Sequence, residues 1–440
     1  MINFKKVALA ATCTAMLGGV SGVVTTANAA NWLMLQGTER PGAAPRAKVW
    51  GFIQAEYQST DDTKIAAGPW AGQKAIFNQQ RPDLKSAEGF NVLRARVGVR
   101  GTAMPLDSNV NYFLLAEFGN NGITRQGGGN VKVSDASITL NHIDGARIRI
   151  GMFKTPGSEE GLQAIHVFDY VNFTGATNGL LLERFFDADG STAGAVNAPN
   201  GPVGAFRDVG VQIFDTFKKG NWEHSYAAMI GNGNGITRGE NNDSQETYLY
   251  WASELVYGGK GGRRQGLKLY AWNQTGKRTY KGSTTENDRD RSGFGLTFRK
   301  GKHRAAFEHI MADGMIFNGT DGGATPGARN NANTASAGFN MATTGEADGS
   351  YIHYGYAINN KWEVDARYDI YNRLTNSSAG ERKFETVTLG AQYFMNKKSR
   401  FIINYEMRDG EAPNLASTAG PNRILSSIDD RISVQILTIF

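Results

Sequence analysis

Beyond its first 29 residues, this sequence contains no cysteine. The one cysteine, Cys13, lies in an N-terminal stretch that opens with Lys5 and Lys6, continues through an apolar segment and ends at the small-residue site 27–29. These features predict a secretory signal peptide over residues 1–29. An exported chain without disulfides must be stabilised by other means.

The sequence also lacks a run of 18 apolar residues beyond the signal peptide, which excludes membrane-spanning helices. It has no strong charge either, because the formal net charge of +6 falls to about +4 when the two signal lysines are removed, which is too weak to indicate nucleic acid. Two classes remain, a soluble periplasmic protein and a transmembrane barrel whose segments are apolar only at every second residue.

Motifs of an enzyme or a metal site are missing as well. The six histidines are scattered without metal-ligand spacing, and there is no G-x-S-x-G motif. The segment "DADG" (187–190) resembles the start of a calcium loop but lacks the distal glutamate, and "GNGNG" (231–235) is not followed by a predicted helix, as a phosphate-binding loop requires. We therefore expect no enzymatic activity, no cofactor and no metal.

The sequence does contain a regular alternation of apolar and polar residues over stretches of about ten residues. Examples are "NVNYFLLAEFG" (109–119), "KWEVDARYDIY" (361–371), "RFIINYEMRDG" (400–410) and the C-terminal "RISVQILTIF" (431–440). A period of two predicts β-strands whose two faces meet different environments. We identify sixteen such segments, beginning near residues 48, 89, 109, 131, 146, 207, 221, 246, 264, 291, 302, 350, 361, 383, 400 and 428.

The connections between these segments alternate in length. Short ones such as "KKGN", "KGK" and "NNK" alternate with long ones near 59–88, 120–130, 155–206, 232–245, 274–290, 312–349, 374–382 and 410–427. Short turns at one end and long loops at the other are typical of outer-membrane barrels, whereas a soluble sandwich has no reason to sort its loops by length. The pattern predicts an all-β protein, a 16-stranded antiparallel transmembrane β-barrel over residues 48–440, preceded by an N-terminal linker over 30–47.

Such a barrel must close, because every backbone group in the hydrocarbon needs a partner. The last segment must then pair with the first, near 48–58, and Phe440 would end an outward apolar row at the periplasmic rim. The aromatic residues assigned to the girdles or the lipid-facing surface are Trp50, Tyr57, Trp222, Trp251, Trp362, Tyr368 and Tyr393.

Several stretches resemble the phosphate-selective porin O/P family. They are "VWGFIQAEY" (49–57), "LRARVGVRG" (93–101), "RIRIGMFKTPGSEEGL" (147–162), "LLERFF" (181–186) and "RDVGVQIF" (207–214). The resemblance follows the mature chain in order and is most specific at "GMFKTP" and "RDVGVQ". It implies a sixteen-stranded trimeric porin in the outer membrane of a Gram-negative bacterium, with a long third loop, here 155–206, folded into the lumen as a constriction.

The family name implies uptake of anions past inward arginines and lysines. The positions that lie in matching motifs are Arg94, Arg96, Arg100, Arg147, Arg149, Lys154 and Arg207. The constriction loop departs from a simple ladder of cations, since the residues singled out there are Glu159, Glu160, Glu183 and Arg184.

The strand period gives a separate indication of the charges in the lumen. Inward positions on the second and fifth strands carry arginines, whereas those on the first and thirteenth carry Glu56, Glu363, Asp365, Asp369 and Arg367. A basic wall opposite an acidic wall would create a transverse field. The arginines either face the permeating ion or pair with carboxylates, as Arg94 would with Glu117, and the sequence leaves both open.

These observations predict an outer-membrane porin that passively conducts small hydrophilic solutes, with a preference for anions of the phosphate type. Its partners would be these solutes, outer-membrane lipid and further copies of the chain in a homotrimer, but no nucleic acid. Two alternatives remain. One is a non-selective or sugar-admitting diffusion porin, and the other is a closed barrel that acts as a structural or adhesive surface protein through its loop at 312–349.

Overall fold

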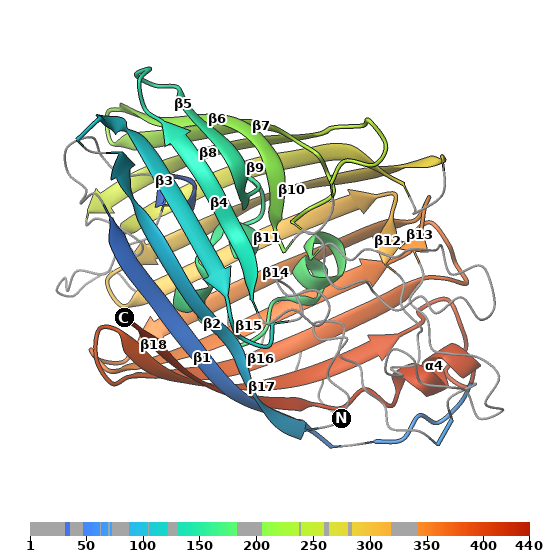
Figure 1. Ribbon diagram of the computed structural model, residues 1–440. Coiled ribbons are helices and arrows are strands. Elements are labelled where there is room, and N and C mark those ends of the chain that lie inside the picture. The colour runs from blue at the N-terminus through green and yellow to red at the C-terminus, as the bar shows by residue number, and fades with distance from the viewer. Residues whose placement is uncertain are drawn as a thin grey trace.

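The computed structural model describes residues 31–35, 47–61, 63–68, 71–72, 88–103, 105–121, 131–182, 205–236, 239–258, 264–279, 284–317 and 341–440. Sixteen antiparallel strands in these ranges close into one barrel, which confirms the predicted fold. Figure 1 shows the strands slanted around a common lumen, with a helical segment inside it.

The barrel strands follow one another around the wall in sequence order. They are β1 (Lys48–Thr60), β2 (Glu88–Ala103), β3 (Asp107–Glu117), β4 (Lys132–Leu140), β5 (Arg147–Lys154), β6 (Arg207–Lys219), β7 (Trp222–Gly231), β8 (Glu246–Gly258), β9 (Gln265–Thr279), β10 (Glu286–Lys300), β11 (His303–Asp313), β14 (Glu346–Ala357), β15 (Trp362–Arg373), β16 (Arg382–Phe394), β17 (Ser399–Glu411) and β18 (Arg431–Ile439). A separate two-stranded sheet, β12 (Ile316–Phe317) with β13 (Met341–Ala342), lies in the connection between β11 and β14.

Short helical segments lie in the N-terminal region and the long loops. They are α2 (Trp32–Leu35), α3 (Glu159–Leu162), the 3₁₀ turn η1 (Ile165–Val167), the π-helical turn η2 (Thr177–Leu181) and α4 (Gly420–Leu425). α2 falls in the segment predicted as a linker, and its first two residues are buried. No helix in the described ranges is long and apolar enough to cross a membrane.

The first and last strands seal the barrel. β18 pairs with β1 in antiparallel register along its whole length. Beyond the strand, Phe440 N donates to Gly51 O at 2.9 Å, and Gly51 N donates to Phe440 O at 3.2 Å. This pairing leaves neither strand with an open edge, which is the condition that a sheet in lipid must meet.

Side chains alternate across the wall, with polar groups inward and apolar groups outward. On β18, Arg431, Ser433 and Gln435 are buried. The intervening Ile432 and Ile436 are 45% and 49% exposed. This inverted pattern suits a barrel with water inside and hydrocarbon outside.

Two strand starts differ from the predicted ones by four or five residues. β10 begins at Glu286 rather than near 291, and β14 begins at Glu346 rather than near 350. The added stretches, "ENDRD" and "EADG", have no large apolar side chain on either face. The strands there continue toward the long loops, where water surrounds the sheet and the apolar alternation is lost.

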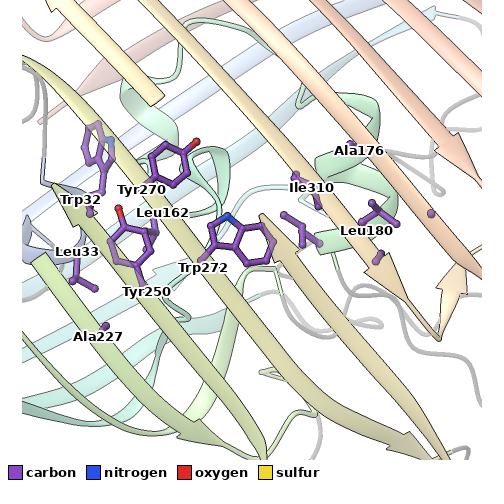
Figure 2. Close-up of a cluster of buried hydrophobic side chains, with 14 of the residues drawn as sticks. Trp32, Leu33, Leu162, Ala176, Leu180, Ala227, Tyr250, Tyr270, Trp272 and Ile310 are labelled. Atoms are coloured by element: carbon purple, nitrogen blue, oxygen red, sulfur yellow. The ribbon is translucent and has the colours of Figure 1, made fainter. Parts of the chain in front are cut away.

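An apolar cluster fills part of the lumen, and Figure 2 shows its side chains reaching in from the wall and from the interior segments. The wall strands β7 to β11 contribute Ala227, Tyr250, Tyr270, Trp272 and Ile310, and α2, α3 and η2 contribute Trp32, Leu33, Leu162 and Leu180. The interior segments therefore rest on this side of the barrel.

Candidate functional site

The third loop crosses the lumen over its described part, residues 155–182. Val171 N donates to Asn404 Oδ1 of β17, and Gly175 N donates to Asp369 Oδ1 of β15, each at 2.8 Å. The loop leaves from β5, so these contacts fix it to the opposite wall. The described part of the predicted constriction loop therefore lies between opposite walls of the barrel.

Glu159, at the start of this loop, is an anchor. It forms an ion pair with Lys268 of β9 and accepts a hydrogen bond from Trp32 Nε1 at 3.1 Å. The carboxylate is buried, so it ties the loop and α2 to the wall. Two other residues predicted in the constriction, Glu183 and Arg184, lie outside the described residues.

Glu160 and Lys154 hold the same loop from within. Glu160 Oε2 accepts a hydrogen bond from Thr174 Oγ1 at 2.7 Å, and Oε1 lies 3.4 Å from Arg367 Nη1. Lys154 Nζ donates to two backbone carbonyls of the loop at 2.8 and 3.3 Å. The contacts with Thr174 and the loop carbonyls fold the beginning of the loop back on itself, and Arg367 of β15 ties Glu160 to the opposite wall.

Arg96 of β2 meets the carboxylate that we expected opposite Arg94. Glu117 lies directly across from Arg96 on β3, and Arg96 Nε is 2.7 Å from Glu117 Oε2. Arg94 Nη1 donates to Gln54 Oε1 at 3.0 Å. A register shift after Thr102 sets this pairing, and an irregularity of that kind is not readable from the strand period.

Two further predicted arginines face carboxylates on other strands, Arg147 on the next strand and Arg207 on β4, two strands away. Arg207 Nε lies 3.0 Å from Asp135 Oδ2, and both side chains are almost fully buried. Arg147 Nε lies 3.3 Å from Asp215 Oδ1 in a more exposed setting. Charge-assisted contacts of this kind stiffen the wall and partly offset the positive potential of the arginines.

Arg149 and Arg100 lie against aromatic rings. The Arg149 guanidinium carbon is 4.4 Å from the centroid of the Phe214 ring, and the side chain is buried. The Arg100 guanidinium carbon is 5.8 Å from the centroid of the Phe113 ring. Such contacts hold a guanidinium without removing its charge.

The acidic wall is bridged by an arginine that the sequence analysis did not single out. Arg304 of β11 lies 3.1 Å from Asp169 and 2.7 Å from Glu363, and it also pairs with Asp365. Asp169, His353 and Asp365 place ligand atoms within 4.8 Å of one another, as a metal site requires. Because the Arg304 cation already bridges these carboxylates, we assign the cluster to an ion-pair network.

A cavity of about 760 Å³ lies in the lumen near the short-turn end of the barrel. Its cationic lining residues are Lys48, Arg96, Arg100, Lys154, Arg207 and Lys398. Asp135 is the acidic side chain among the described lining residues, and the C-terminal residue Phe440 also borders the cavity. The cavity brings together four of the seven predicted cations, whereas Arg94, Arg147 and Arg149 lie elsewhere on the wall.

One side of the cavity is aromatic, and it includes a tryptophan that was predicted elsewhere. Trp50 was predicted in a girdle or on the lipid-facing surface, but it lines the cavity together with Phe52 and Phe113. Trp50 shares the inward face of β1 with Phe52 and Gln54, both of which are buried. A tryptophan is typical of a girdle, which is why Trp50 was assigned there. The period of two along β1 already indicated that its side chain faces the lumen.

A family model described as phosphate-selective porin O and P matches residues 74–419. The chain belongs to this family. Membership makes this porin a channel of the outer membrane. In barrels of this kind the short turns face the periplasm and the long loops face outside. No curated protein matches the porin.

Solved structures show the same fold at low sequence identity. An anion-selective porin from Comamonas acidovorans has a TM-score of 0.53 and 13% identity, covering 90% of this chain and 99% of that one. Salmonella typhi OmpF in complex with daunomycin has a TM-score of 0.54 and 12% identity, covering 90% and 97%. The outer membrane channel DcaP of Acinetobacter baumannii has a TM-score of 0.51 and 10% identity, covering 92% and 100%.

Two cavity cations, Lys48 and Lys398, were absent from the predicted set. Lys48 opens β1, and Lys398 lies in the turn before β17. Neither lies in a stretch that matches the family motifs. The inward face of β1 could have indicated Lys48. The position of Lys398 follows only from the closure of the barrel, which places this turn next to β18, the strand that pairs with β1.

Proposed function

We propose that this porin conducts small hydrophilic anions, inorganic phosphate among them, by passive diffusion. The observation that carries the proposal is the cavity near the short-turn end, which we call the periplasmic cavity. Its described lining has six cationic side chains and one aspartate. Low-dielectric walls focus the field of fixed charges and raise the local concentration of counter-ions. A guanidinium also offers a planar pair of donors to phosphate or carboxylate oxygens.

Ion pairing favours a modest rather than an exclusive preference. Arg96 and Arg207 each face a carboxylate, and Lys154 donates to loop carbonyls. A pore with partly offset charges would still admit neutral solutes and some cations. A general diffusion porin is therefore the second candidate, and it is separated from the first by the size of the anion preference.

The remaining features of the proposal concern the setting of the barrel. We propose that residues 1–29 direct export in a Gram-negative bacterium and that the exposed outward apolar side chains face outer-membrane lipid. A homotrimer is the assembly that the family resemblance implies. Chemical cross-linking of the purified porin in detergent tests this assembly and should yield a three-chain product.

The function is tested by neutralising cavity cations without removing a described ion pair. Replacing Lys48 and Lys398 with Gln should lower the anion-to-cation permeability ratio, measured from the reversal potential across a planar bilayer. Lys219→Gln, at the exposed end of β6, is the matched control and should leave the ratio unchanged. An unaltered ratio in the double variant would contradict the proposed role of the cavity.

A further inference from the structure

Three neighbouring strands present an aromatic and basic pattern to the periplasmic cavity. Trp50 of β1 lies opposite Gly98 of β2, in the row between those that hold Arg96 and Arg100. Arg96 lies opposite Phe52, and Arg100 lies opposite Phe113 on the third strand. The indole therefore has an arginine on either side of it along the pore axis.

Gly98 makes room for the indole. A Cβ atom at position 98 would come within 3.0 Å of Trp50 Nε1 and within 2.9 Å of Leu115 Cδ1. Without that atom, the Trp50 ring settles against β2 at the level between the two arginines. A bulkier residue at 98 would push the ring into the lumen.

Other rings surround the indole and fix its orientation. The Trp50 centroid lies 6.1 Å from that of Phe113 and 6.3 Å from that of Phe52. The His166 ring of the third loop meets the indole edge-on at 5.8 Å. Spacings and angles of this kind are those of favourable aromatic packing, so the cluster forms a rigid apolar surface.

The flanking cations are held in reach of this surface. The guanidinium carbon of Arg96 is 5.8 Å from the Phe52 centroid, and that of Arg100 is 5.8 Å from the Phe113 centroid. The two arginines are four positions apart in the strand, which is about 13 Å along β2. Arginine side chains are long enough to bring both guanidinium groups toward a molecule that stacks on the indole.

We propose that the Trp50 surface between Arg96 and Arg100 is a binding site for aromatic carboxylates of the benzoate class. The ring of the ligand would stack on the indole, and its carboxylate would accept hydrogen bonds from one of the guanidinium groups. The inference deepens the proposed function, because it assigns a substrate class to the same cavity. A small inorganic anion would use the cations alone and leave the aromatic surface unused.

The test compares two carboxylates of similar size and charge. Benzoate and cyclohexanecarboxylate are added from the periplasmic side while chloride current is recorded through single channels. Benzoate should block half of the current at a concentration roughly 2- to 10-fold lower than the saturated acid, since only the planar ring stacks well. Equal blocking concentrations in the unaltered porin would overturn the inference.

Substitutions of Trp50 test whether its indole causes the preference for benzoate over cyclohexanecarboxylate. Trp50→Leu should abolish the difference between the two acids, and Trp50→Phe should keep part of it. Trp251→Leu, on the outward surface of β8, should retain the full difference. If Trp50→Leu folds and still discriminates as well as the unaltered porin, the site lies elsewhere and the inference is wrong.

The benzoate test and the test of the proposed function can fail independently of each other. A reversal potential that shows no anion preference, together with benzoate discrimination, would contradict the proposed function and leave the aromatic site intact. Anion preference without benzoate discrimination would do the reverse. The two measurements use the same bilayer, so both outcomes are read from one preparation.

Discussion

Arg96 and Glu117 face each other across β2 and β3, and their side chains meet at 2.7 Å inside the barrel. Arg96 borders the periplasmic cavity, whereas Glu117 is completely buried behind it. The pair therefore has a structural part, the stiffening of the wall, and an electrostatic part, the charge that the cavity presents to ions. Variants of the two residues separate these parts.

We predict opposite effects on selectivity for the two partners. Glu117→Gln should raise the anion-to-cation permeability ratio, because the charge of Arg96 is no longer offset. Arg96→Gln should lower it and cost about 1–3 kcal/mol of stability, since a buried carboxylate then loses its partner. The ratio is measured from reversal potentials, and shifts in the same direction for both variants would contradict the account.

The ion pair between Glu159 and Lys268 should control how firmly the third loop is held. Glu159→Gln keeps the size of the side chain but removes its charge, so we expect larger fluctuations of the open-channel current. Lys268→Met should act in the same way, and the double variant should be little worse than either single one. Glu286→Gln breaks an exposed pair with Lys277 and should change nothing measurable.

Trp32 should limit the width of the lumen from the N-terminal side. Its indole donates to Glu159 and packs in the apolar cluster, so Trp32→Ala removes both a hydrogen bond and a buried ring. We expect a higher single-channel conductance and a loss of roughly 3–5 kcal/mol in the packing of the interior segments. Trp251→Ala, on the outer surface, is the control, and an unchanged conductance in Trp32→Ala would show that α2 does not obstruct the pore.

The charge of the cavity should not depend on His166 near neutral pH. Burial, together with the neighbouring Arg400 and Lys154, lowers the pKa of His166 to about 3. The imidazole is then neutral between about pH 8 and 5, so His166→Gln should leave the reversal potential unchanged over this range. A divergence of the two reversal potentials below about pH 7 would contradict the assignment.

The lowered pKa of His166 also makes the stability of the porin depend on pH. An unfolded histidine has a pKa of about 6.5, so protons bind the unfolded chain more readily than the folded one. Above about pH 6.5 the imidazole is neutral in both states and His166 does not oppose folding. As the pH falls toward 3, protonation of the unfolded chain lowers the free energy of unfolding. Unfolding temperatures in detergent should therefore fall more steeply between about pH 6 and 4 for the unaltered porin than for His166→Gln.

The sequence was sufficient for the barrel because a membrane imposes a simple rule on each strand. Apolar residues such as Ile432 and Ile436 must face lipid, so the period of two marks every crossing. The rule weakens where strands leave the hydrocarbon, as at Glu286. The alternation rule applies to membrane-spanning strands and says nothing about segments inside the lumen. The burial of α2 against Glu159 therefore could not be predicted.

The site was only partly predictable for a related reason. Matching motifs identified Arg96, Arg100, Lys154 and Arg207, which the barrel gathers at one cavity. Which arginine meets Glu117 depends on a register shift, a local irregularity that the pattern does not specify. Trp50 was assigned from its residue type to the girdle, although its strand face indicated the lumen.

The central claim is that fixed positive charge in the periplasmic cavity makes this porin prefer anions. The most direct test is the zero-current potential of the unaltered porin in a planar bilayer under a tenfold potassium chloride gradient. The account predicts a potential displaced toward the chloride equilibrium value, and a smaller displacement once Lys48 and Lys398 are replaced by Gln. A potential at zero, or one displaced toward the potassium equilibrium value, would contradict it.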